Sequence, residues 1–298
     1  MNHNHIIHKI KELCPEATFL PNPTFPEFTF IPDLAIKKGD KLIIIEIVEL
    51  KPNENIDWRT LRLLEYLFEV KLTLGNNAIF NLIIKNNTLL KTYCTELLEN
   101  LFDKVYYFEE LDELRDLNLL AKTQLNELWN FERQYVRTQY HNKSNLDLKK
   151  YKFVELNNLE VEEKIQTILG RANLELTKNV PVRNLKNDFI TGEKNLRFYF
   201  DFQVNHNLIE YKAFKRISNI DIQNLLIQAR LVRYTKDGGV LHLVHSAKKM
   251  ILLINGKIGG PSYDPKRFIR MLVGAGWQIY PIDILEHHQE FIDLITND

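Results

Sequence analysis

Apolar and polar residues follow the same order of short segments in both halves of the chain. The first half contains four apolar runs of strand length, at residues 28–36, 41–50, 78–85 and 104–108. Three further segments have helical spacing, at residues 6–13, 58–74 and 95–102. Residues 42–45 are wholly apolar, which is typical of a central strand whose two faces are covered by helices. Three prolines in residues 20–28 predict an extended or looped segment. The first half therefore predicts an α/β module.

The second half predicts the same order of elements. Strand-like runs lie at residues 175–182, 198–203, 208–213, 240–246, 250–255 and 277–281. Helical patterns lie at residues 159–169, 221–234 and 265–275, and Gly170 is expected to end the first of these helices. The repetition lies in the order of elements and not in sequence identity. We predict two α/β modules, at residues 1–115 and 151–298, each with a mixed central sheet flanked by helices.

A charged stretch lies between the modules. Leucines recur at one-sided helical spacing in residues 109–139, at Leu111, Leu114, Leu117, Leu120, Leu125 and Leu128. Polar residues 142–145 interrupt this pattern, so residues 116–150 are predicted to be a helical connector. Such a helix can serve as a strut between modules or as the surface of a homodimer, and we favour the strut.

Candidate chemistry is concentrated in the predicted hairpin of residues 197–217. Residues 205–207 supply turn chemistry, and Phe200 lies on a strand that alternates apolar and polar residues. Glu210 and Lys212 share one face of the second strand, because side chains repeat every second residue. A hairpin can bring Asp201 beside them. Two carboxylates and an ammonium would then converge among apolar residues.

This layout resembles the PD-(D/E)xK nuclease superfamily, whose restriction-endonuclease-like fold matches the predicted elements of roughly residues 155–285. Phe200 stands where the nominal motif has proline. The resemblance implies a catalytic Asp201, Glu210 and Lys212. It also implies a Mg²⁺ ion, replaceable by Mn²⁺, held by Asp201, Glu210 and the backbone carbonyl of Tyr211. The alternative is an exposed hairpin with an ordinary Glu-Lys pair.

Further residues are candidates for a wider site. The resemblance also implies that a glutamate of the helix that opens the second module can join the metal site, which makes Glu163 an additional candidate metal ligand or catalytic residue. The alternative, which we favour, is a solvated helix face. Four basic residues near the helix after the hairpin are candidate contacts to nucleic-acid phosphates: Lys215, Arg216, Arg230 and Arg233.

The first module contains a similar but incomplete pattern. Asp33 follows a proline, Glu46 lies on the next strand, and Val48 stands where the second module has Lys212. Residues 49–51 offer another Glu-x-Lys, but on the opposite strand face from Glu46. The first module is therefore expected to be a degenerate nuclease-like fold, and the alternative is an unrelated α/β domain in which Asp33 and Glu46 are incidental.

Composition limits the possible partners. The chain of 298 residues has a formal net charge of zero, which excludes a globally basic nucleic-acid binder. Residues 1–150 carry 19 basic and 22 acidic residues and residues 151–298 carry 20 and 17, which is compatible with a local positive cleft in the second half. Cys14 and Cys94 lack metal-ligand spacing, so we expect a cytoplasmic protein without a zinc site. No apolar run approaches about eighteen residues, so no membrane span is expected.

These patterns favour a Mg²⁺-dependent endonuclease that hydrolyses DNA, of the type II restriction kind or a related defence or repair nuclease. RNA is not excluded as the substrate. The rival hypothesis is a non-catalytic nucleic-acid-binding or assembly subunit built on nuclease-like folds.

Overall fold

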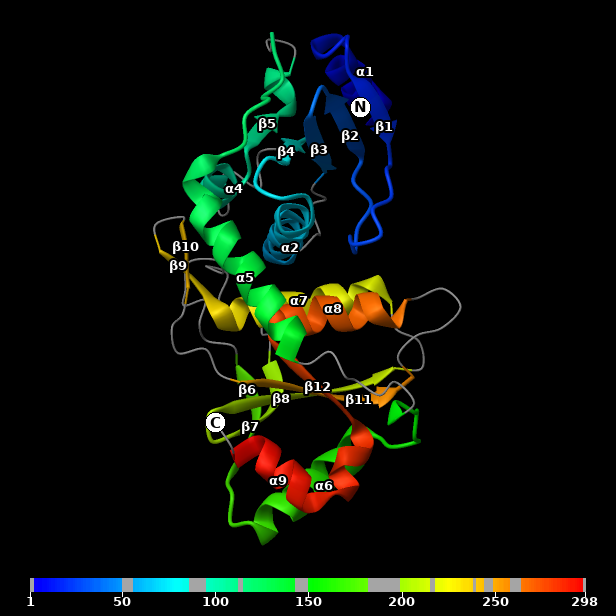
Figure 1. Cartoon of the computed structure of the whole chain (residues 1–298), viewed down its shortest axis with the longest axis vertical. Helices are drawn as coiled ribbons and strands as arrows, with labels where there is room; N and C mark the ends of the chain where they lie inside the picture. The colour runs from blue at the N-terminus through cyan, green and yellow to red at the C-terminus, as the bar shows by residue number, and fades with distance from the viewer. Residues whose placement is uncertain are drawn as a thin grey trace. The chain divides into compact units, whose positions relative to one another are not determined.

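The chain contains two compact α/β units, each built around one five-stranded sheet (Figure 1). The structure is a computed structural model, and it describes residues 3–49, 56–85, 95–111, 115–142, 150–181, 199–214, 218–237, 240–243, 249–257 and 264–296. The division between the units falls within helix α5 (Asn126–Asn142), after Gln134. The predicted connector at residues 116–150 thus includes a helix that belongs to the first unit at its start and to the second unit at its end.

The first unit has a mixed sheet in the order β1-β2-β3-β4-β5. Its elements are α1 (His3–Leu13), β1 (Thr18–Pro21), β2 (Leu34–Lys38), β3 (Lys41–Val48), α2 (Ile56–Leu74), β4 (Ile79–Ile84), α4 (Thr95–Leu101) and β5 (Lys104–Tyr107). The first two pairings, β1 with β2 and β2 with β3, are antiparallel. The pairings of β3 with β4 and of β4 with β5 are parallel.

The second unit repeats this topology. Its elements are α6 (Asn158–Arg171), β6 (Leu176–Pro181), β7 (Tyr199–Val204), β8 (Asn207–Phe214), α7 (Asn219–Arg233), β11 (Met250–Gly256), α8 (Pro265–Ala275), β12 (Trp277–Pro281), η4 (Ile282–Glu286) and α9 (His288–Thr296). Strands β9 (Tyr234–Asp237) and β10 (Val240–Leu243) form a separate two-stranded sheet, of which Lys236–His242 group with the first unit. The sheet has the order β6-β7-β8-β11-β12, with two antiparallel pairings followed by two parallel ones. The predicted pair of α/β modules with mixed, helix-flanked sheets is confirmed.

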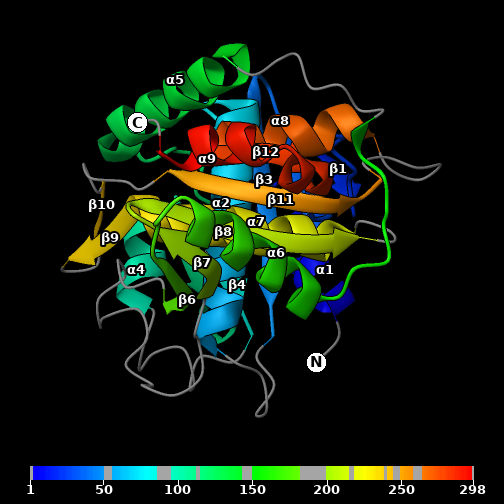
Figure 2. The ribbon, with the colours of Figure 1, turned by 90° about the horizontal axis from the view of Figure 1, so that it is seen from below.

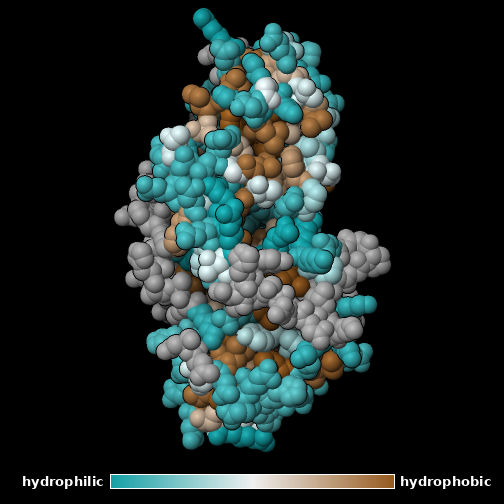
Figure 3. All heavy atoms as spheres, viewed as in Figure 1, coloured by the Kyte–Doolittle hydropathy of each residue, from teal (hydrophilic) through white to brown (hydrophobic). Residues whose placement is uncertain are grey.

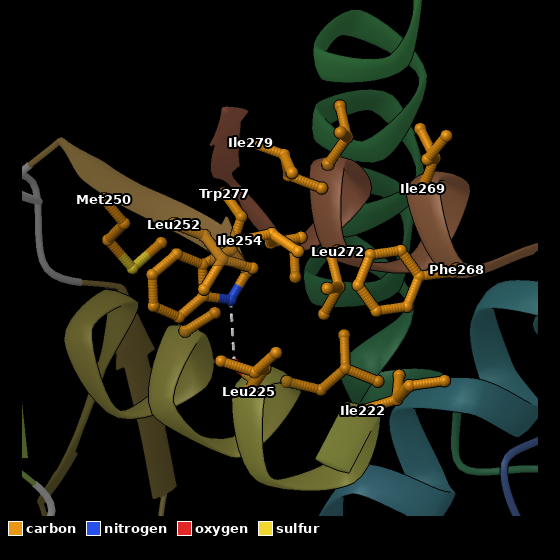
Figure 4. Close-up of a cluster of buried hydrophobic side chains, with 14 of the residues drawn as sticks. Ile222, Leu225, Met250, Leu252, Ile254, Phe268, Ile269, Leu272, Trp277 and Ile279 are labelled. Atoms are coloured by element: carbon orange, nitrogen blue, oxygen red, sulfur yellow. Dashed lines mark hydrogen bonds between the residues drawn. The ribbon is translucent and has the colours of Figure 1, made fainter. Parts of the chain in front are cut away.

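Helices cover both faces of the second sheet. Figures 1 and 2 show α7 and α8 along one face and α6 and α9 along the other. On the α7–α8 face, Trp277 donates a hydrogen bond from Nε1 to the backbone oxygen of Leu225 at 2.9 Å, within the apolar cluster drawn in Figure 4. On the opposite face, α6 buries Val161 and Ile165 against the sheet. The outward sides of α6 and α9 are mainly hydrophilic (Figure 3).

The first sheet also has two unlike faces. Ile43, Ile45 and Ile47 of β3 pack in one apolar cluster with Ile6 and Ile10 of α1. The intervening residues of β3 point to the other face, because side chains alternate along a strand. Helix α2 lies on that face, where the side chain of its Arg59 approaches Glu46 of β3 to 4.0 Å.

Several predicted elements differ from the observed ones. The proline-rich segment at residues 20–28 overlaps the end of β1, an edge strand, where proline is accepted. Residues 28–33, predicted to begin a strand, are not a strand, and β2 begins at Leu34. The predicted strand at residues 240–246 includes β10, which pairs with β9 outside the five-stranded sheets, and residues 244–246 lie outside the described residues. Gly170 lies inside α6, which ends two residues later with Ala172 as its C-cap.

The charged stretch at residues 109–139 is not one helix. Only α5, starting at Asn126, is a long helix there, and Leu111 and Leu117 are buried in the core of the first unit. The side chain of Asn118 bonds the backbone at Leu120 in both directions, at 2.8 and 3.2 Å. Such local side-chain bonds compete with helix formation. Among the described helices, none combines the length and the apolar character needed to cross a membrane.

Candidate functional site

The β7–β8 hairpin brings Asp201 and Glu210 together. A two-residue turn joins the strands, and its first residue, Asn205, has a φ of 51°, a conformation that asparagine tolerates. Phe202 pairs with Ile209, so the next residues outward are Asp201 and Glu210. The predicted convergence of these two side chains is therefore present.

At this point the two carboxylates take the place of backbone carbonyls as hydrogen-bond acceptors between β7 and β8. Tyr211 donates its backbone N–H to Oδ2 of Asp201 at 2.7 Å, and Asp201 donates its own N–H to Oε2 of Glu210 at 3.3 Å. The backbone pairing of the hairpin stops one pair earlier, at Phe202. Each carboxylate therefore satisfies a backbone donor of the opposite strand, which fixes the position of both side chains.

Two further side chains contact Glu210. Lys212 forms an ion pair through Nζ with Oε1 of Glu210, and 38% of the Lys212 side chain is exposed against 2% of that of Glu210. Gln228 of α7 forms a side-chain hydrogen bond with Glu210 and donates another from Nε2 to the backbone oxygen of Tyr199 at 3.1 Å. Sequence reasoning missed Gln228. The sequence feature that could have identified it is a glutamine within the apolar stripe of an amphipathic helix.

Burial sets the electrostatics of this pair. Loss of water is the largest cause that raises the pKa of Glu210, to about 7, and the Asp201 charge acts in the same direction. Lys212 and Gln228 act to lower that pKa. The pKa of Asp201 is raised as well, mainly by burial, against the lowering effects of the Tyr211 N–H and of Lys212. Two carboxylates held this closely away from water favour a cation beside them.

The buried side chains of β7 switch from one face of the sheet to the other at Asp201. Phe200 belongs to the apolar cluster under α7 and α8, whereas Phe202 belongs to the cluster under α6 and α9. The predicted alternation of apolar and polar residues is present as alternating burial along β7, but the buried Phe200 and Phe202 lie on opposite faces of the sheet. Asn179 of the neighbouring edge strand lies opposite Asp201 in the register and has a φ of 49°. The irregular backbone of β6 accompanies the change of face.

Tyr211 is anchored on the far side of the sheet. Its hydroxyl accepts a hydrogen bond from Nδ2 of Asn255 at 2.9 Å and donates to the backbone oxygen of Leu156 at 3.4 Å. These contacts hold the backbone of β8 between Glu210 and Lys212. The role of the Tyr211 carbonyl as a metal ligand stays a prediction.

Glu163 does not join the pair. It is exposed on α6, which packs on the sheet face opposite to Glu210 and Lys212, and it lines a separate shallow pocket that contains neither Asp201 nor Glu210. The predicted contribution of Glu163 to the site is not supported, because strand alternation directs Glu210 away from α6.

The predicted phosphate-binding residues differ in their surroundings. Arg233 is only 2% exposed, and its guanidinium carbon lies 3.6 Å from the ring centre of Tyr135, so the prediction that it contacts phosphate does not fit its burial. Arg230 is half-buried in the last turn of α7. Lys215 and Arg216 lie outside the described residues.

The first unit places its two candidate acids in the same way. Leu34 pairs with Ile45, so Asp33 and Glu46 lie one step beyond the last pair of the β2–β3 ladder. Val48, at the position of Lys212, is fully buried. The degenerate pattern predicted from the sequence is thus present as geometry, with no lysine at the strand position.

The second-unit residues fit a magnesium ion. Mg²⁺ keeps several waters and is held by one or two carboxylates, which is the set that Asp201 and Glu210 offer. Within the described ranges, no group of three or more histidine, cysteine, aspartate or glutamate side chains is placed to hold a metal ion. Asp201 is half-buried and 38% of the Lys212 side chain is exposed, whereas Glu210 is almost fully buried.

Comparisons of the chain with protein-family models, with curated proteins and with solved structures give no match. The function is therefore argued from the geometry of the site.

Proposed function

We propose that the chain is a Mg²⁺-dependent endonuclease that hydrolyses phosphodiester bonds in DNA, with its active site in the second unit. The observation that carries the proposal is the convergence of Asp201, Glu210 and Lys212 at the open end of the β7–β8 ladder. The sheet around this site has the mixed order that the PD-(D/E)xK resemblance implies. A type II restriction enzyme or a related defence or repair nuclease is the proposed class.

Each side chain has a distinct proposed role. Bound Mg²⁺ would polarise the phosphate and lower the pKa of a water molecule. Asp201 and Glu210 supply oxygen ligands, and the Tyr211 carbonyl is a third. Lys212 orients the attacking water and balances the negative charge that develops on the phosphate. Gln228 fixes the carboxylate of Glu210.

The proposal extends to the residues that contact DNA and to the cellular location of the protein. Arg230, Lys215 and Arg216 are the proposed contacts to DNA phosphates, in a chain whose net charge of zero limits binding to a local surface. We also propose a cytoplasmic location, because Cys14 and Cys94 show no disulfide or metal spacing. A homodimer is a further prediction.

A second candidate is a non-catalytic nucleic-acid-binding or assembly subunit. The observation in its favour is the loss of the lysine in the first unit, where Val48 occupies the corresponding position. The complete set of Asp201, Glu210 and Lys212 in the second unit favours catalysis.

Incubation with nucleic acid separates the two candidates. Supercoiled plasmid DNA and an RNA of matched sequence are incubated with the protein and Mg²⁺, with and without EDTA. The proposal predicts nicked or linear DNA only with Mg²⁺, and loss of product in Asp201→Asn. Mg²⁺-dependent cleavage of the RNA alone would change the substrate class. Absence of product from either nucleic acid, with nucleic-acid binding retained, would support the non-catalytic subunit.

A further inference from the structure

The backbone geometry of the candidate site occurs a second time, in the first unit. Ile47 donates its N–H to Oδ2 of Asp33 at 2.6 Å, as Tyr211 donates to Asp201 at 2.7 Å. Asp33 in turn donates a backbone hydrogen bond to Glu46. The same pair of exchanges between carboxylate and backbone therefore fixes the acidic side chains in both units.

The different spacing of the acids preserves this geometry. Twelve residues separate Asp33 from Glu46, whereas eight separate Asp201 from Glu210. The longer hairpin has two additional residues in each strand and keeps a two-residue turn. Because side chains repeat every second residue, two added residues per strand leave both acids on their original face.

The neighbouring backbone agrees as well. Asn22, with a φ of 45°, donates its N–H to the backbone oxygen of Asp33 at 3.0 Å, and Asn179, with a φ of 49°, lies opposite Asp201. The hairpin turns begin with Gly39 and Asn205, which both have positive φ. The correspondence thus extends over three strands and not only over two acids.

Glu46 has an unsatisfied oxygen. The residue is 7% exposed, and its Oε2 atom has no hydrogen-bond partner among the described residues. Burying a carboxylate without compensation is costly, and the adjacent Asp33 adds to that cost. Burial and Asp33 together raise the pKa of Glu46 to about 8, against the opposing effect of Arg59.

Arg59 of α2 compensates for Glu46 only in part. Its Nη2 lies 4.0 Å from Oε1 of Glu46, which is beyond the distance of about 2.7–2.9 Å typical of a charge-assisted hydrogen bond. The strand position that holds Lys212 in the second unit is the buried Val48. Strand β3 therefore places no ammonium beside this glutamate, and Oε2 is left available to another cation.

We propose that Asp33 and Glu46 form a second divalent-cation site, which binds a hydrated Mg²⁺ or Mn²⁺ ion and cleaves no DNA. The two carboxylates supply the oxygen ligands that such an ion prefers, and waters supply the rest. Without an ammonium on the strand to orient a water, the site lacks the group assigned to the hydrolytic step in the second unit. This inference concerns ion binding and does not depend on cleavage by the second unit.

Mn²⁺ binding to the full chain tests the proposal. In a chain carrying Asp201→Asn and Glu210→Gln, the second unit is disabled, and about one Mn²⁺ ion per chain should still bind. Adding Glu46→Gln should weaken that binding by about 10–100-fold or more, as expected for loss of a direct ligand. Absence of Mn²⁺ binding before Glu46→Gln, or unchanged binding after it, would overturn the proposal. Glu49→Gln, which changes an exposed carboxylate directly after β3, is the matched control and should leave Mn²⁺ binding unchanged.

Two further readouts keep the test decisive. If Glu46→Gln impairs folding, judged by thermal unfolding in EDTA, Arg59→Ala replaces it: removal of the competing guanidinium should tighten Mn²⁺ binding about tenfold, and unchanged or weaker binding contradicts the proposal. In the otherwise unchanged chain, Asp33→Asn with Glu46→Gln should leave any DNA cleavage intact. Loss of cleavage in this variant, with retained fold and DNA affinity, would contradict the proposal that the Asp33–Glu46 site takes no part in cleavage.

Discussion

A carboxylate as buried as that of Glu210 keeps its charge only where its neighbours replace the lost water. Lys212 contributes a positive charge and Gln228 a hydrogen bond, whereas Asp201 contributes a second negative charge. The balance leaves the pKa of Glu210 at about 7, so near neutral pH the carboxyl group of Glu210 is partly protonated in the metal-free site. Binding of a divalent cation would favour the ionised form of both acids.

Gln228 is predicted to be a positioning residue. Gln228→Met keeps the volume of the side chain and removes its hydrogen bonds to Glu210 and to Tyr199. Loss of one aligning hydrogen bond, at about 0.5–1.5 kcal/mol, should slow single-turnover cleavage up to about tenfold. The DNA dissociation constant, measured by fluorescence anisotropy, should not change. A parental cleavage rate would remove Gln228 from the site.

The residues of the site were not equally predictable. Asp201, Glu210 and Lys212 follow from the sequence because strand periodicity fixes the face and the turn fixes the register. Gln228 and Arg59 come from helices, and their distance to the strands depends on how each helix packs on the sheet. No local pattern in the sequence contains that information.

At the scale of the elements, the close approach of β11 and β8 depends on Gly256. Gly256 pairs with Phe214, and a Cβ atom there would lie 3.0 Å from the backbone carbon of Phe214 and in steric overlap with its oxygen. Because backbone cannot move aside cheaply, Gly256→Ala should destabilise the fold by about 1–3 kcal/mol. Chemical denaturation measures the effect.

Gly170 provides the matched comparison. It lies inside α6, and no atom lies within 4 Å of the position that a Cβ would take, so Gly170→Ala should stabilise the fold by about 0.4–1 kcal/mol. If Gly170 ended the helix in a left-handed conformation, as the sequence suggested, the same change would destabilise the fold. Equal effects of the two alanine substitutions would contradict both assignments.

A buried ion pair joins three elements of the first unit. Asp103 accepts hydrogen bonds from Lys71 Nζ and from the Phe80 N–H, each at 2.7 Å, and from the Lys122 N–H at 2.6 Å. Asp103→Ala leaves a buried ammonium without its partner and should cost about 3–5 kcal/mol in urea denaturation. Removing Glu286, which forms an exposed pair, should cost at most about 1 kcal/mol. A cost for Asp103→Ala as small as that for Glu286→Ala would contradict the structural role.

The elements that the sequence predicted poorly share a cause. Continuous apolar runs such as β3 are recognisable because burial on both faces leaves a local signature. Residues 28–33 contain three large apolar side chains but do not form a strand. Phe28 and Phe30 stack with ring centres 5.1 Å apart, and Phe30 stacks on Tyr66 of α2 at 3.9 Å. Tertiary contacts with a helix thus explain a burial that the pattern alone attributes to a strand.

At the scale of the whole chain, one topology occurs twice with different site chemistry. Both units place an aspartate and a glutamate beyond the end of an antiparallel ladder, and only the second unit has a lysine two residues after the glutamate, where the first unit has Val48. We therefore propose cleavage in the second unit and ion binding alone in the first. The element order was readable from the sequence, whereas the pairing of each strand depends on contacts distant along the chain.

Single-turnover cleavage by Lys212→Ala, with enzyme in excess over a plasmid substrate at saturating Mg²⁺, tests the nuclease assignment most directly. Loss of a group that orients water or stabilises charge typically slows a reaction by about 10²–10⁴-fold, and Lys212→Arg should not restore the rate, because a planar fork does not replace a compact ammonium. Lys164→Ala, which removes an equally charged side chain from the opposite sheet face, should cleave at the parental rate. Cleavage by Lys212→Ala at the parental rate would show that Asp201, Glu210 and Lys212 do not form the active site.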